Sequence, residues 1–359
     1  MTAQTMPAQP GEDTSRRPVP WRRMAGVTWR QHRFALAGVV GLLGVLAVWL
    51  WIVGTSLHHA YAAAIACRPV GSPTCDDPQT GLTSIFNGMD NFLSNGIILQ
   101  VLPVLIGAFV GAPLLAREME TGTFRYTWTQ GFGRWRWTLA KLVALGLAVT
   151  VAAELFSLVS GWYYQPYFNT GNSALAINEM SPFNSGLFDL GRVTFAAWTL
   201  TAFSIGALAG MLIRRVVPAI AATLAVYAGL AFAAGGFLRE HYLTPLVTTS
   251  LNLPGTAWIL SQWWTKGGTT LSQSTMHQVM LSALDRIAPG GPPSRTVAGK
   301  FQVLGSAAQY LTHHGYTQWT KYQPASRFWP FQWIEGGWLL ALSLLLLAAT
   351  VWLVRRRAA

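Results

Sequence analysis

Six long runs of apolar residues constrain this chain more than any other feature. They cover residues 34–54, 96–116, 139–161, 191–213, 216–237 and 337–354 of the 359-residue sequence. An α-helix rises ~1.5 Å per residue, so each run supplies the roughly 20 residues that a helix needs to cross ~30 Å of hydrocarbon. A strand would need only about half as many. The runs therefore predict an all-α membrane protein with six transmembrane helices.

The positive charge of the chain lies on alternate sides of these runs. Sixteen of the 25 Lys and Arg fall in the N-terminal arm, the second and fourth loops and the C-terminus, with only four of the 13 acidic residues. By the positive-inside rule, those segments are expected to be cytoplasmic. We therefore expect a multi-pass protein of the plasma membrane with both termini in the cytoplasm.

A soluble basic patch is the usual sign of nucleic-acid binding. Here the net charge of +12 flanks segments long enough to cross hydrocarbon. The lipid bilayer is therefore the expected partner, and a nucleic acid is not.

The polar segments divide the chain into parts. Residues 1–20 are rich in Pro, Gln, Thr and Ser, a composition typical of a disordered arm. Residues 34–237 hold five spans, residues 238–335 are expected to form a large extracytoplasmic cap, and residues 336–359 hold the last span and a basic C-terminus.

Residues 21–33 are predicted to form an amphipathic helix in front of the first span. On a helical wheel Arg22, Arg30 and Arg33 fall on one arc, and Trp21 falls on the other. Such a helix can lie in the inner headgroup layer, with its basic side toward phosphate. The alternative is a basic flank that only sets the orientation of the chain.

The cap carries two helical patterns. Apolar residues recur at helical spacing over 276–287 and again over 301–311, and a Pro/Gly stretch at 288–294 separates them. The aromatic residues between 316 and 333 are expected to form an interfacial belt where the chain returns to the bilayer.

Cys67 and Cys75 are the two cysteines of the chain, and both lie in the first outward loop. A disulfide can persist outside the cytoplasm, and this spacing closes a small loop. We expect a disulfide, with two free thiols as the alternative. No metal site is expected, because two cysteines give too few ligands.

The second loop, residues 117–137, is the one predicted cytoplasmic loop long enough to fold. The second span is expected to continue through Glu118 and Glu120 and to end at Gly122, because glycine readily ends a helix. Thr121 or Thr123 could then cap a short new helix. A loop that only joins two spans would need about four residues rather than some twenty.

The sequence lacks the short motifs of nucleotide-dependent and metal-dependent enzymes. A phosphate-binding loop needs Gly, four residues and then Gly-Lys-Ser/Thr, but Ser294 and Phe301 occupy the required positions around Gly299 and Lys300. Neither His-Glu-x-x-His nor Gly-x-Ser-x-Gly occurs. We therefore expect that the chain is not an enzyme and holds no cofactor of its own.

Glu154 is the ionisable residue that lies well within a predicted span. A carboxylate there costs roughly 2.5 to 3.5 kcal/mol unless it is paired or faces water. It is a candidate for the transport pathway. A protonated or hydrogen-bonded Glu near the outer third of its helix is an equal alternative.

Two Gly-x-x-x-Gly pairs lie inside the spans, Gly107 with Gly111 and Gly206 with Gly210. Small residues permit close approach of helices. We expect these pairs to serve packing within the chain rather than contact with a second copy.

Residues 116–123, followed by Thr129, Gln130, Arg134, Trp137 and Lys141, resemble the cytoplasmic loop between the second and third spans of type-2 ATP-binding cassette (ABC) permeases. Residues 322–329 are similar to the stretch before the last span of actinobacterial members. The resemblance extends to the topology of six spans with both ends inside.

This resemblance implies the membrane subunit of an ATP-driven transporter, with export as the expected direction. ATP and Mg would be bound by a separate ATPase subunit, and a second permease, identical or paralogous, would complete the pathway. The coupling residues implied are Glu118, Glu120, Gly122, Thr123 and Arg134. The alternatives are a membrane-embedded enzyme or an envelope-stress signalling protein with an extracytoplasmic cap.

Overall fold

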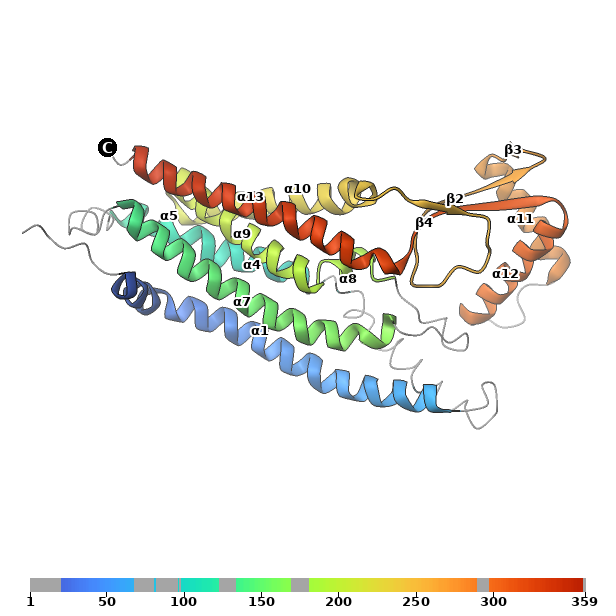
Figure 1. Cartoon of the computed structure of the whole chain (residues 1–359), viewed down its shortest axis with the longest axis horizontal. Helices are drawn as coiled ribbons and strands as arrows, with labels where there is room; N and C mark the ends of the chain where they lie inside the picture. Colours follow the sequence, from blue (N-terminus) through green and yellow to red (C-terminus); the bar gives the residue numbers. More distant parts are fainter. Residues whose placement is uncertain are drawn as a thin grey trace, which may run out of the picture.

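The computed structural model describes residues 21–67, 81, 96, 98–122, 134–168, 181–288 and 297–357. Within these ranges, six helices are long and apolar enough to cross a membrane, which confirms the six predicted spans. Figure 1 shows them as one elongated bundle, with a small domain of strands and helices projecting from one end. The predicted arm at 1–20 lies outside the described residues.

The first, third, fifth and sixth spans are longer than the apolar runs that predicted them, because their helices continue beyond hydrocarbon length. The second span is interrupted by a π-helical turn, and the fifth ends in a π-helical turn followed by a 3₁₀ turn. In chain order the spans are α1 (Trp21–Ala66), α4 with η2 and α5 (Val101–Ile106, Gly107–Gly111, Ala112–Thr121), α7 (Arg134–Phe168), α9 (Arg192–Ile213), α10 with η4 and η5 (Val216–Ala233, Ala234–Leu238, Arg239–His241) and α13 (Phe328–Arg357).

The fourth span, α9, lies at the centre of the bundle. It contacts α13, α7, α5, α10 and α4, and its aromatic residues Phe195, Trp198 and Phe203 are buried. By contrast, α1, α10 and α13 expose large apolar side chains such as Phe34, Val217 and Leu345. An apolar exterior around a packed centre is the arrangement that a lipid environment permits.

The two Gly-x-x-x-Gly pairs cross each other where the second span packs on α9. A Cβ atom on Gly206 would lie 2.4 Å from the carbonyl oxygen of Gly107, and one on Gly210 would lie 2.4 Å from that of Ala112. These backbones are too close for any side chain at the crossing. The predicted role of both pairs in packing within the chain is confirmed.

The domain beyond the bundle corrects the prediction of an all-α protein. It holds a four-stranded antiparallel sheet in the order β1-β4-β2-β3. The strands are β1 (Leu246–Thr248), β2 (Trp258–Lys266), β3 (Thr269–Thr270) and β4 (Tyr316–Gln323). Both β2 and β4 are rich in aromatic residues and Thr, which are favoured in strands. The aromatic residues of β4 belong to the stretch that the sequence assigns to a membrane interface.

The two helices predicted for this domain are confirmed as α11 (Gln273–Ile287) and α12 (Val297–His313). They pack on one face of the sheet, where Trp264 meets Ala283, Ala307 and Leu311. The predicted aromatic belt is divided: Tyr316, Trp319 and Tyr322 lie in β4, whereas the residues from Phe328 onward begin α13.

The glycine crossing yields a stability prediction. Gly206→Ala should lower the free energy of unfolding by about 1–3 kcal/mol, the usual cost of overpacking, because the new methyl group would meet backbone atoms of the second span. The measurement is thermal unfolding of the detergent-purified protein. Gly229→Ala is the matched control, since a Cβ atom there meets nothing within 4 Å. Equal effects of the two substitutions would contradict the close crossing.

Candidate functional site

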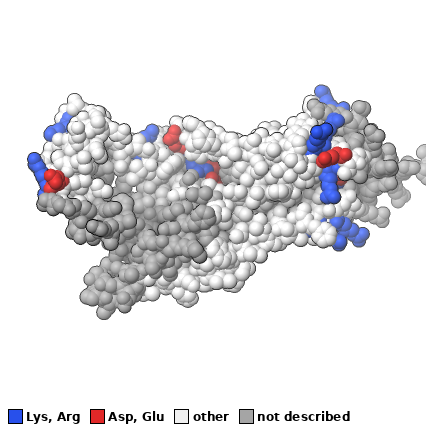
Figure 2. Space-filling view, turned by 180° about the vertical axis from the view of Figure 1, so that it is seen from behind, with Lys and Arg blue, Asp and Glu red and all other residues white. Residues whose placement is uncertain are grey.

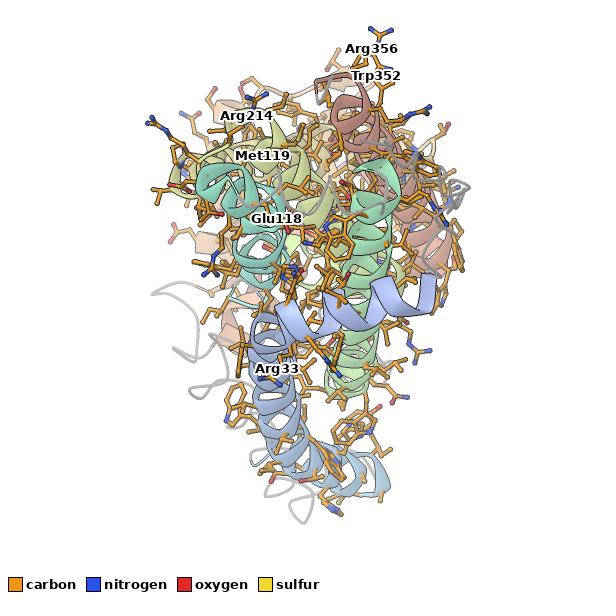
Figure 3. The ribbon with its side chains drawn as sticks, turned by 90° about the vertical axis from the view of Figure 1, so that its left-hand side faces the viewer. Arg33, Glu118, Met119, Arg214, Trp352 and Arg356 are labelled. Atoms are coloured by element: carbon orange, nitrogen blue, oxygen red, sulfur yellow. The ribbon has the colours of Figure 1, made fainter. Side chains whose placement is uncertain are left out.

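Positive charge gathers at the end of the bundle that lies opposite the sheet domain (Figure 2). We call this the basic end and define it by the exposed residues Arg117, Arg214, Arg215, Arg355 and Arg356. Figure 3 looks onto it and shows the first turns of α1 running across the bundle before the chain turns near Arg33. The short segments predicted to share one side of the membrane thus lie together.

The end of the second span follows the sequence prediction. Helix α5 continues through Glu118 and Glu120 to Thr121, and Gly122 terminates it in the left-handed conformation with φ 71°. Glycine adopts this conformation without the steric penalty that a side chain would incur. The carboxylates therefore stand on the last turn of a rigid helix.

Glu118 forms an ion pair with Lys141 of α7. The Lys141 side chain is fully buried, and that of Glu118 is 22% exposed. The Lys141 ammonium also lies 4.6 Å from the centroid of the Trp137 ring, a favourable position for a cation over an aromatic face. The ion pair fixes the end of the second span to the start of the third.

Glu120 contacts a different helix. Its Oε2 atom accepts a hydrogen bond of 3.1 Å from the backbone N–H of Val216, the first residue of α10. The first N–H groups of a helix have no partner within it, so a carboxylate there satisfies a donor and complements the helix dipole. The last turn of α5 is therefore fixed to both the third and fifth spans.

The remaining predicted residues of this end are described only in part. Thr123 lies outside the described residues. Arg134 is the first residue of α7, and Trp21 and Arg22 belong to α1; the structure describes their backbone alone. Arg30 and Arg33 are exposed on α1. Cys67 is disulfide-bonded, and the chain's other cysteine, Cys75, lies outside the described residues.

Glu154 stands on α7, away from both ends of its helix. It is partly buried, and the opposite charge that acts on it is Arg192 at the start of α9. Among the residues that the structure describes, no partner hydrogen-bonds its carboxylate. Its role in a transport pathway remains a prediction.

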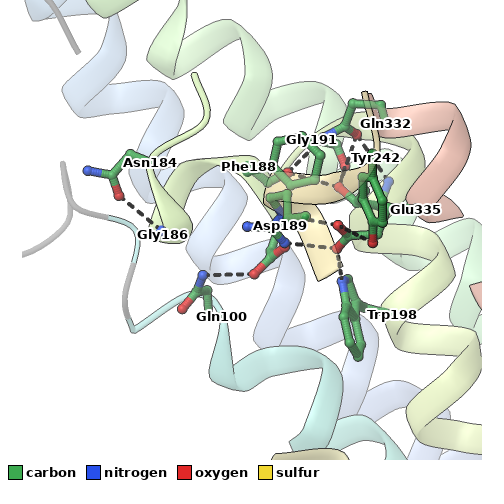
Figure 4. Close-up of polar contacts among 12 residues, drawn as sticks. Gln100, Asn184, Gly186, Phe188, Asp189, Gly191, Trp198, Tyr242, Gln332 and Glu335 are labelled. Atoms are coloured by element: carbon green, nitrogen blue, oxygen red, sulfur yellow. Dashed lines mark hydrogen bonds and ion pairs between the residues drawn. The ribbon is translucent and has the colours of Figure 1, made fainter. Parts of the chain in front are cut away.

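A buried charge cluster, which sequence analysis missed, lies near the opposite end of the bundle. It comprises Asp189 before α9, Arg239 after α10 and Glu335 in the first part of α13 (Figure 4). The Arg239 side chain is 2% exposed and that of Glu335 is 0% exposed. Three separate spans are thereby held together at their ends.

Glu335 is the fully compensated carboxylate of the cluster. Arg239 donates to both of its oxygens, from Nε at 3.0 Å and from Nη2 at 2.8 Å. Trp198 donates to Oε1 at 3.1 Å, and Tyr242 donates to Oε2 at 3.2 Å. This is the full satisfaction that a buried charge requires.

Asp189 is held less completely. Arg239 donates to one of its oxygens, and Gln100 donates to the other at 3.0 Å. Burial raises the pKa of Asp189 to about 6; Arg239 opposes this shift and Glu335 reinforces it. The Asp189 side chain is 24% exposed, so Asp189, unlike Glu335, remains accessible.

A neutral network next to the cluster connects α9 with α13. Gln332 donates from Nε2 to the carbonyl oxygen of Phe188 at 2.8 Å, and its Oε1 accepts from the backbone N–H of Thr194 at 3.2 Å. The Phe188 ring lies 4.1 Å from the Arg239 guanidinium. These contacts hold the segment carrying Asp189 in a fixed position.

A clue to this cluster was present in the sequence. The N-terminal arm, the second and fourth loops and the C-terminus together account for the surplus of positive charge, so the remaining charges balance one another. Three of those balanced charges stand at the ends of predicted spans. Their balance hinted at pairing, but their partners could not be identified without the packing.

The chain was compared with known proteins. The profile of a family described as ABC-2 membrane transporter related matches residues 40–239, which is more than half of the chain. The match includes most of α1 and continues through Arg239, so it covers both glycine crossings, Glu118 and Asp189. It excludes the sheet domain and α13. The comparisons with curated proteins and with solved structures found no match.

The charge cluster yields a prediction about stability and pH. Arg239→Gln should lower the free energy of unfolding by about 3–5 kcal/mol at pH 8, because it leaves two buried carboxylates unpaired. Without Arg239 the pKa of Asp189 should rise above about 6. A raised folded-state pKa favours the folded state at low pH and opposes it as the pH rises. The loss of unfolding free energy caused by Arg239→Gln should therefore be smaller at pH 5.5.

Thermal unfolding at the two pH values measures this effect. Arg286→Gln is the control, since Arg286 lies on the surface of α11 and donates to the Tyr310 hydroxyl; its effect should stay within about 0.5 kcal/mol. A defect of equal size at both pH values would contradict the role assigned to Arg239.

Proposed function

Because this chain belongs to the ABC-2 membrane transporter related family, we propose that it is the membrane subunit of an ATP-driven exporter. It would work with a separate ATPase that binds ATP and Mg, and with a second permease subunit. The basic end would face the cytoplasm of a cell whose plasma membrane holds the bundle, and the sheet domain would project outward. The positive-inside rule supports that orientation.

The observation that carries the proposal is the double attachment of the last turn of α5. An ATPase below the membrane can move the spans only through a stiff element rooted in them. Glu118 binds Lys141 of the third span, and Glu120 binds the first N–H of the fifth. A force applied to the segment after Gly122 would therefore be transmitted to the second, third and fifth spans together.

This arrangement suggests a specific role for the two carboxylates. The resemblance implied that Glu118 and Glu120 take part in coupling, and both are engaged within the chain. We propose that they brace the lever, while exposed groups around it, such as Arg117 and Arg214, meet the partner.

A membrane-embedded enzyme remains a second candidate because of one observation. An enzyme of this kind would need titratable groups converging at the membrane edge, and the charge cluster provides such a convergence. Its fully buried carboxylate, Glu335, accepts from Arg239, Trp198 and Tyr242, which leaves it poorly suited to accept a proton from a substrate. We therefore favour transport. An envelope-stress sensor would require the sheet domain to signal without transport.

The experiment uses the chain together with the ATPase encoded beside its gene, reconstituted in proteoliposomes. Glu118→Gln should reduce stimulation of ATP hydrolysis by the permease about tenfold while the ATPase still co-purifies, because Lys141 loses its partner and the lever loosens. Glu240→Gln is the control, since Glu240 is exposed near the opposite end of the bundle, and it should leave stimulation unchanged.

Two results would overturn the proposal. One is a wild-type chain that neither binds the ATPase nor alters its turnover. The other is normal coupling in a Glu118→Gln and Glu120→Ala double variant, which would show that the last turn of α5 carries no force.

A further inference from the structure

A cavity of ≈ 290 Å³ lies between α4, α9 and α10, beside the charge cluster. This volume is near the lower bound of roughly 300–1,000 Å³ for small-molecule sites. The wall is mostly apolar and is formed by residues of α4 and α10. Its distinctive residues are Gln100, Asp189, Phe195, Trp198 and Tyr227.

The cavity has a negatively charged rim. Two carboxylates share the single guanidinium of Arg239, so the cluster keeps one negative charge when both are ionised. Arg239 and two further donors satisfy Glu335, which is fully buried. The uncompensated charge therefore resides on Asp189, the carboxylate of the cluster that lines the cavity.

Tyr227 supplies a second polar group to the cavity. It lines the cavity and is 8% exposed. Among the residues that the structure describes, nothing hydrogen-bonds to its hydroxyl. A phenol hydroxyl can both donate and accept a hydrogen bond. Its oxygen, together with the carboxylate of Asp189, can therefore accept from a ligand that donates.

The aromatic walls favour the same class of ligand. The rings of Trp198 and Tyr227 pack edge to face, with centroids 5.3 Å apart and an interplanar angle of 69°, and Phe195 lines the same space. Aromatic faces attract cations, most strongly where water is excluded. Carboxylate, phenol and rings together disfavour an anion and suit a cation with an apolar body.

We propose that this cavity binds small organic cations, with a primary ammonium or guanidinium group donating to Asp189 and Tyr227 and an apolar body contacting α4 and α10. The proposal rests on the proposed transport function and names its cargo class. Trp198 and Phe195 would pack on the bound molecule, while Arg239 positions Asp189 without touching the ligand.

Binding should depend on pH. The pKa of Asp189, raised to about 6 mainly by burial, places its protonation just below neutrality. The groups that face it are Arg239 of η5, Glu335 of α13, Gln100 before α4 and Tyr227 of α10. Because protonation removes the counter-charge, cation binding should weaken as the pH falls from 7.5 to 5.

The experiment measures equilibrium binding of tritiated phenethylammonium to the purified full chain in nanodiscs, without any ATPase. The neutral isostere n-propylbenzene and the anion 3-phenylpropionate are the competitors. Phenethylammonium should bind saturably. Each competitor should displace the labelled ligand at least tenfold less well than unlabelled phenethylammonium does. Asp189→Asn should weaken binding at least tenfold, and Tyr227→Phe about threefold to tenfold.

Two further variants guard against a change of fold. Asp285→Asn, on the exposed surface of α11, is the matched control and should bind normally. Ala228→Leu leaves the cluster intact but narrows the cavity that Ala228 lines, and it should weaken binding at least tenfold. Each variant is accepted only if its thermal unfolding matches that of the wild type to within a few degrees.

Three outcomes would overturn the proposal. Equal displacement by n-propylbenzene would mean an apolar groove for a lipid chain. No saturable binding would mean that the cavity is not a site for organic cations. Normal binding in Ala228→Leu would place the cation elsewhere. Because no ATPase is present, each result is independent of the coupling experiment that tests the proposed function.

Discussion

The cost of placing charge in hydrocarbon organises this protein. The bundle exposes apolar side chains around its middle, and its buried charges are paired near the ends of helices. Lys141 is paired with Glu118 near the basic end, and Arg239 is paired with Glu335 and Asp189 near the other. A buried charge that lost its partner would destabilise the fold by several kcal/mol. The same pairs therefore fix which spans lie together.

Between these ends, the bundle relies on close backbone packing. The glycine crossing brings the second span directly against α9, and α9 also contacts α7, α10 and α13. The π-helical turn at Gly107–Gly111 lies within this crossing. A force applied at the last turn of α5 would thus meet a tightly packed partner, whereas the lipid-facing helices have freer surfaces.

Sequence reasoning performed unevenly, for identifiable reasons. It located Gly122 as the end of the second span, because a helix end depends on local conformation. It also assigned both glycine pairs to packing within the chain. It missed the sheet, because Trp and Tyr in β4 resemble residues of a membrane interface when their strand partners are unknown. It named Glu118 and Glu120 as coupling residues, but it could not identify Lys141 and the N–H of Val216 as their partners within the chain.

The sequence by itself determined the number of spans, their approximate positions in the chain, and the end of the bundle that carries the positive charge. Those properties follow from composition and charge along a continuous stretch of chain. Only the tertiary structure decided that Asp189, Arg239 and Glu335 form one cluster, that Glu120 caps α10, and that a cavity lies beside Asp189. Arg239 and Glu335 are 96 residues apart, and pairing over that distance is set by how helices pack, which local sequence patterns do not encode.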